Sequence, residues 1–123
     1  MSATHMVYVA LPIRIVSEAN LRQHWRTVAA RKSLHRNTAK CILQSHARPC
    51  EPGSVVITLT RVSARELDDD NLASGFKACR DGVADWLGID DGDKRLTWAY
   101  RQRKPAKGAT AQIGAEVVVE WPA

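Results

Sequence analysis

The feature that most constrains this fold is a run of three carboxylates, Asp68, Asp69 and Asp70, in an otherwise basic chain. Consecutive carboxylates repel one another, so a stable fold keeps them where positive charge offsets the repulsion. A helix N-terminus, an arginine cluster or a hard divalent cation such as Mg²⁺ would each do so. A second acidic pair, Asp90 and Asp91, follows later in the chain. These two segments are the first candidates for a functional site.

Bulk composition favours one small domain with an anionic partner. The chain has 123 residues, 45% of them hydrophobic, which suits a single domain spanning residues 1–123. Its net charge is +5 at pH 7, and a basic surface attracts polyanions such as nucleic acid. An acidic pocket in such a protein indicates chemistry on a polyanion.

The cysteines and the N-terminal sequence indicate a reduced, cytoplasmic setting. Cys41, Cys50 and Cys79 are odd in number, with no C-x-x-C spacing and no Cys/His cluster suited to zinc. The first residues lack a basic segment followed by a long apolar one, and no segment approaches the length of a membrane span. We therefore expect a cytoplasmic protein with no membrane partner.

Apolar alternation predicts four strands. It covers residues 7–15, where Pro12 indicates an edge or a bulge, and residues 54–62. Two later runs, 96–100 and 113–121, form an antiparallel pair if the basic connection at 101–108 closes as a hairpin.

Two segments carry helical patterns. Residues 19–47 contain many good helix formers and no Gly, and are predicted to form a helix, in one piece or divided near Ser33. Residues 70–87 carry an apolar stripe with helical spacing, although Gly75 and Gly82 each cost roughly 1 kcal/mol in a helix interior. The predicted fold is an α/β (α+β) domain with a mixed four-stranded sheet and two helices, in the order β-α-β-α-β-β.

The second helix would align several polar residues with the acidic run. At 100° per residue, one stripe contains Asp70, Ser74, Lys77, Asp81 and Asp85. Asp68 can join Asp70 from an extended segment, because i and i+2 side chains share a face. The alternative is structural: the run caps a helix, and Asp91 with Gly92 forms a turn. A lysine between the two acidic segments favours a site.

Three spaced motifs resemble those of the RusA-like Holliday junction resolvases. They are D-x-D-N-L at residues 68–72, K-x-x-x-D at 77–81 and D-D at 90–91. The resemblance covers mainly residues 66–101, and it implies that Asp68, Asp70 and Asp91 bind Mg²⁺, or Mn²⁺ in its place, and that Lys77 assists catalysis. The family lysine usually lies three residues after the asparagine, where this chain has Ser74. Lys77 is one turn further along a continuous helix, about 4.5 Å.

The resemblance implies an endonuclease that resolves four-way DNA junctions in recombination and repair, with no small-molecule cofactor. A carboxylate-held metal polarises the phosphate and lowers the pKa of a bound water, while a nearby ammonium offsets transition-state charge. Glu66 or Asp69 could orient the water. A two-fold junction needs two symmetric nicks and each chain offers one acidic cluster, so we expect a homodimer.

Basic residues supply candidate phosphate contacts, with a merely soluble charged face as the alternative. The candidates are Arg22, Arg26, Arg31, Lys32 and Arg36 in the first helix, and Arg101, Arg103 and Lys104 near the late connection. Trp25, among them, is expected in the core, with base stacking or a subunit contact as alternatives. Trp86 and Trp98 are expected in the core.

Two other functional classes remain open. The first is a non-catalytic nucleic-acid-binding module that keeps the RusA-like fold, which the displaced lysine favours. The second is an assembly protein whose acidic run is purely structural. Metal-dependent nicking of DNA would distinguish the nuclease from the binding module. Binding to DNA would distinguish both of these from the assembly protein.

Overall fold

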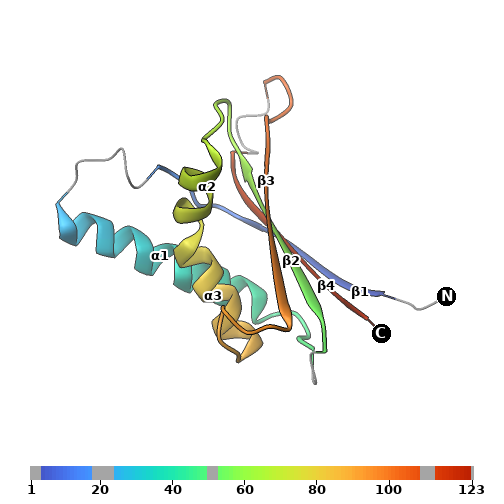
Figure 1. Ribbon diagram of the computed structural model, residues 1–123. Coiled ribbons are helices and arrows are strands. Elements are labelled where there is room, and N and C mark those ends of the chain that lie inside the picture. The colour runs from blue at the N-terminus through green and yellow to red at the C-terminus, as the bar shows by residue number, and fades with distance from the viewer. Residues whose placement is uncertain (1–3, 18–23, 50–52, 109–112, 123) are drawn as a thin grey trace.

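A four-stranded mixed sheet carries three helices on one face, forming a small α+β domain (Figure 1). The computed structural model describes residues 4–17, 24–49, 53–108 and 113–122. The elements are β1 (Thr4–Leu11), α1 (Trp25–Leu43), β2 (Val55–Val62), α2 (Asp69–Gly75), α3 (Lys77–Leu87), β3 (Leu96–Arg103) and β4 (Gly114–Pro122). The predicted fold class and element order are confirmed, with three helices in place of two.

The sheet order is β1-β4-β2-β3, so the two late strands are not the predicted hairpin. Strand β2 separates them, parallel to β3 and antiparallel to β4. Val117 and Val119 of β4 are fully buried, which requires a central position, whereas most of β3 is at least partly exposed and suits an edge. The crossover through α2 and α3 places β3 parallel to β2, as β-α-β connections do.

Strand β1 is shorter than its apolar pattern suggests. It pairs with β4 only as far as Leu11, because Pro12 has no N–H to donate and the N–H of Ile13 turns back to the Leu11 carbonyl (2.8 Å). Ile13 and Ile15 stay buried beyond the strand. The predicted apolar face is thus correct to residue 15, but its last part is not a strand.

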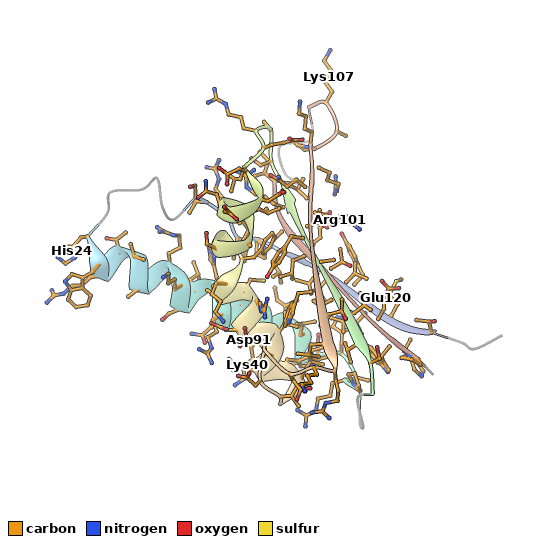
Figure 2. The ribbon with its side chains drawn as sticks, viewed as in Figure 1. His24, Lys40, Asp91, Arg101, Lys107 and Glu120 are labelled. Carbon is orange, nitrogen blue, oxygen red and sulfur yellow. The ribbon has the colours of Figure 1, made fainter. Side chains whose placement is uncertain are left out.

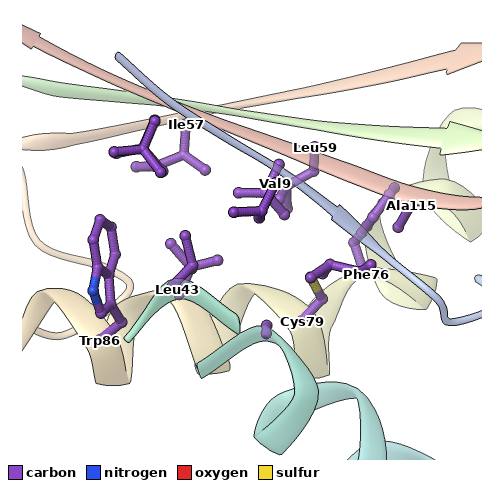
Figure 3. Close-up of a cluster of buried hydrophobic side chains, with 14 of the residues drawn as sticks. Val9, Leu43, Ile57, Leu59, Phe76, Cys79, Trp86 and Ala115 are labelled. Carbon is purple, nitrogen blue, oxygen red and sulfur yellow. The ribbon is translucent and has the colours of Figure 1, made fainter. Parts of the chain in front are cut away.

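The core lies between the sheet and the helices (Figure 3). Ile57 and Leu59 of β2 are fully buried there against Leu43 of α1 and Phe76. Burying such a side chain contributes about 1.5–3 kcal/mol, so this cluster is the main source of stability. Cys79 is also in the cluster, and burial raises the pKa of its thiol to about 12.

The predicted helix over residues 70–87 is two helices, α2 and α3, divided at Phe76. Its glycines allow close packing. A Cβ on Gly75 would lie 2.7 Å from the carbonyl oxygen of Val16, and one on Gly82 would lie 2.2 Å from that of Arg36 in α1. The low helix propensity of glycine is therefore offset by tight contacts, which a bulkier residue would prevent.

Helix α1 is continuous over 19 residues, with no division at Ser33. Its buried residues are His35, Ala39 and Leu43, all in its second half. No helix in the described ranges is both long enough and apolar enough to cross a bilayer.

Candidate active site

A tight loop between α3 and β3 presents Asp91. Helix α3 ends at Leu87 and is capped by Gly88, whose φ of 76° is left-handed and favours glycine. The Asp90 carboxylate then accepts a hydrogen bond from the Gly92 N–H (3.0 Å), and the Asp90 carbonyl accepts one from Asp93 N–H (3.0 Å). The predicted turn is therefore present, and it returns Asp91 to the side of α3 (Figure 2).

Two cations of α3 converge on Asp91. Lys77 Nζ lies 2.8 Å from Asp91 Oδ2, and Arg80 Nε lies 2.9 Å from the same oxygen. Lys77 and Arg80 are three residues apart and so share one helix face. The displaced lysine, Lys77 of the K-x-x-x-D motif, therefore does meet the second acidic pair.

Strand β3 fixes this cluster from the other side. Trp98 Nε1 donates to the Asp91 carbonyl (2.8 Å), as does Arg80 Nη2 (3.0 Å). Arg80 also donates to the Tyr100 hydroxyl (3.0 Å), and its guanidinium lies 4.6 Å from the Trp98 ring centroid. Sequence reasoning missed Arg80, although its i+3 spacing from Lys77 was a usable signal. Trp98 is half-buried and both packs against the core and anchors the loop.

The cluster is ionic at neutral pH. Hydrogen bonds from Lys77, and then from Arg80, lower the pKa of Asp91, with partial burial acting in the opposite direction. Hydrogen bonds to Asp91 and to Asp81 (2.9 Å) raise the pKa of Lys77. The Lys77 side chain is still 56% exposed, so an anion in solution can reach it.

The first acidic run begins a helix. Asp68 is the N-cap of α2, and its two carboxylate oxygens accept from the backbone N–H (2.9 Å) and side-chain amide (3.0 Å) of Asn71. Asp69 and Asp70 occupy the exposed first turn, where the helix dipole favours negative charge. The structural alternative for this run, in which it caps a helix, is thus observed.

Two side chains on one face of β3, Trp98 and Gln102, hydrogen-bond to the backbone at the two acidic segments at different points along the strand. The side-chain amide of Gln102 donates to the Leu67 carbonyl (2.8 Å) and accepts from the Leu67 N–H (2.8 Å), directly before Asp68. The anchor for Asp91 is Trp98, four residues away along the strand. At about 3.3 Å per residue the two anchors lie about 13 Å apart. The sequence pattern did not reveal Gln102.

The carboxylates suit Mg²⁺ chemically, since it takes oxygen ligands. However, in the part of the chain that the structure describes, no group of three His, Cys, Asp or Glu residues could hold a metal ion. Asp68 is engaged by Asn71, and Asp91 by two cations. The described arrangement therefore does not assemble Asp68, Asp70 and Asp91 into one metal site, and the metal assignment stays a prediction.

The candidate DNA-contacting residues form two groups on different sides. Four of them lie on α1: Arg26, Arg31, Lys32 and Arg36. Arg101 and Arg103 alternate with Trp98 and Tyr100 along β3 and so face away from the helices, and exposed Lys104 follows them. Arg103 is paired with Glu116 (2.8 Å). Arg22 lies outside the described residues.

The α1 group adjoins the Asp91 cluster. A groove of about 290 Å³ between α1 and α3 is lined by Lys32, Ser33, Arg36, Lys77, Ala78 and Asp81. A second hollow of about 170 Å³ is lined by residues that include Arg36, Asp81 and Asp91. Because Arg36 and Asp81 line both, the two hollows are neighbours. Arg36 is held between them by Asp85 (2.7 and 2.9 Å).

Comparisons with known proteins do not identify the chain. No family model and no curated protein matches the sequence. One solved structure that is similar to part of it is the 2C-methyl-D-erythritol 2,4-cyclodiphosphate synthase of Plasmodium vivax, with 13% identity over 75% of this chain and a TM-score of 0.28. The match spans 53% of that protein's length. Similarity at this level carries no argument about function.

Proposed function

We propose that this protein is a Mg²⁺-dependent, structure-selective endodeoxyribonuclease of RusA type that resolves four-way DNA junctions. The observation that supports the proposal best is the contact between Lys77 Nζ and Asp91 Oδ2 at 2.8 Å. These residues belong to two motifs that the resemblance assigns to one catalytic centre. They meet although the lysine is displaced by one turn from its usual position.

The chain's own residues suit phosphate chemistry at this point. Asp81 and Asp91 hold the Lys77 ammonium from two sides, and Arg80 is fixed by Tyr100 and Asp91. A pre-oriented ammonium next to a phosphodiester offsets the charge that develops on the phosphate oxygens during cleavage. Mg²⁺, when bound, would polarise the phosphate and lower the pKa of a water.

The proposal includes a homodimer acting on branched DNA. Each chain supplies one Lys77–Asp91 cluster, and resolution of a two-fold junction needs two symmetric incisions. Light scattering at micromolar concentration tests this directly, and a monomer would contradict it.

The activity is tested with purified protein and a synthetic four-way junction labelled on each strand. We expect paired nicks with Mg²⁺ or Mn²⁺ and none in chelator, because the reaction depends on the metal. Asp70→Asn should abolish nicking and bind the junction at least as well as wild type. Equal cleavage in chelator, or an active Asp70→Asn protein, would overturn the nuclease proposal.

A second candidate is a nucleic-acid-binding module without catalysis. The observation that favours it is the engagement of Asp91 Oδ2 by both Lys77 and Arg80, which already balances its charge. Such a protein would bind the junction with strong salt dependence, since its cations release counterions. It would nick no strand with either metal.

A further inference from the structure

The first half of α1 is an unusual element for so small a domain. It projects beyond the sheet and the other helices, with His24 at its tip (Figures 1 and 2). All the buried residues of α1 lie in the second half. Trp25 is 68% exposed, so the expectation that it belongs to the core is wrong: it is the first residue of α1, next to His24 at the tip.

The charge on α1 has one sign. Its 19 residues include no Asp or Glu and five cations, Arg26, Arg31, Lys32, Arg36 and Lys40. Lys32 has no ion pair among the described residues, whereas Arg36 is paired with Asp85. A second copy of the same helix would be repelled by this charge, while a polyanion would be attracted.

Trp25 shares one face of α1 with two of these cations. Lys32 and Arg36 follow it by seven and eleven residues, which places both within about 20° of Trp25 around the helix. Arg26 lies over the indole ring, 5.2 Å from its centroid. The exposed aromatic ring thus stands at the end of a cationic stripe.

The stripe leads to the proposed active site. Lys32 and Arg36 line the α1–α3 groove together with Lys77, whose ammonium contacts Asp91. Trp25 precedes Arg36 by eleven residues, about 16 Å along the helix. A strand whose phosphates lie in the groove can therefore place a nearby base at the indole.

We propose that α1 is a nucleic-acid-binding arm in which Trp25 stacks on an unpaired base and Lys32 binds the adjoining backbone phosphates. The inference rests on the proposed function for the identity of the ligand as DNA. An indole needs the free face of a base, and in a paired duplex neighbouring bases cover that face. The arm thus selects DNA with unpaired bases, such as a single strand or a branch point whose central bases are unpaired.

Binding in chelator tests the inference without cleavage. Fluorescence anisotropy is measured with a labelled single strand, a four-way junction with unpaired bases at its centre, and a blunt duplex of equal length. Trp25→Ala should weaken binding to the first two about tenfold and leave the duplex unchanged, because stacking needs an exposed base. Trp25→Phe should keep most of the affinity. Lys32→Ala should weaken binding to all three and reduce the salt dependence.

Leu34→Ala is the matched control. Leu34 is also an exposed apolar residue on α1, at 59% exposure, but nine residues after Trp25 it lies on the opposite face, about 180° away. We expect it to bind all three DNAs as wild type does.

Several results would overturn the inference. The first is a Trp25→Ala protein that binds every DNA as wild type does, or that loses as much affinity for the duplex as for the other two DNAs. The second is a Trp25→Ala protein with unchanged DNA affinity and an altered sedimentation coefficient, which indicates a subunit contact. The third is a wild-type protein that binds no DNA. Trp25-dependent binding without any nicking in Mg²⁺ would instead support the arm and reject the nuclease.

Discussion

The two acidic segments show two ways of stabilising clustered carboxylates. The run at 68–70 is stabilised locally, because Asp68 caps α2 and its neighbours occupy the first helical turn. Asp91 is stabilised by Lys77 and Arg80, which come from another element and reach it only through the fold. The sequence presents both as similar acidic motifs, yet among the described residues only the second is paired with two cations of another element.

The largest effect on stability should come from Asp91. Asp91→Asn leaves Lys77 and the partly buried Arg80 facing each other without their shared carboxylate. We expect a loss of about 1–2 kcal/mol, since hydrogen bonds to charged groups are strong but partial exposure weakens them. Thermal unfolding should show a midpoint several degrees lower. Relief of acidic repulsion alone predicts the opposite sign, so an unchanged or raised midpoint would refute the cluster.

Substitution of Asp68 should affect stability differently, because capping α2 needs only a side-chain hydrogen-bond acceptor. Asp68→Ala should destabilise the protein by about 1 kcal/mol through loss of the cap, whereas Asp68→Asn should be nearly neutral. Chemical denaturation measures both. If Asp68→Asn keeps full stability and loses cleavage, Asp68 is also a ligand; if Asp68→Ala is as stable as wild type, the cap is unimportant.

The third prediction concerns how the contribution of Asp91 to stability depends on pH. The Lys77 and Arg80 contacts lower the pKa of Asp91 in the folded state, so its contribution is present above the unfolded value of about 3.9 and is lost as pH falls through the lower folded value. The free energy of unfolding should therefore decline below about pH 4. Asp91→Asn should show a shallower decline than wild type, and identical slopes would contradict the assignment.

The smallest effects should come from moving the lysine. Ser74 is exposed, and within the described part of the chain its hydroxyl donates only to the Asp70 carbonyl (2.9 Å), so Ser74→Lys should change stability by less than about 0.5 kcal/mol. It restores the family spacing and should leave cleavage unchanged or faster. Lys77→Ala should lower turnover more than junction affinity. Equal losses in both would make Lys77 a binding residue.

Local patterns in the sequence predicted more of the fold than of the site. Alternation in β1, β2 and β4 and the stripe of α3 correctly predicted the core, because each depends on neighbouring residues. The β3–β4 hairpin was wrong since strand order depends on the α2–α3 crossover. The helix breaks at Phe76, next to Gly75, which packs against the backbone of Val16, distant in sequence. Spacing places Arg80 on the helix face of Lys77, but the partners of Arg80 and of Gln102 come from tertiary contacts, which local spacing does not encode.

The role of the Lys77–Asp91 cluster in catalysis is tested by comparing Asp91→Asn with Asp93→Asn in junction cleavage with Mg²⁺. Asp93 is a matched control, since it lies in the same loop but, among the described residues, its carboxylate pairs with Arg95 and not with Lys77 or Arg80. We expect Asp91→Asn to bind the junction and make no nicks, and Asp93→Asn to cleave at the wild-type rate. An Asp91→Asn protein that cleaves as fast as the Asp93→Asn protein would contradict the central role of the Lys77–Asp91 cluster.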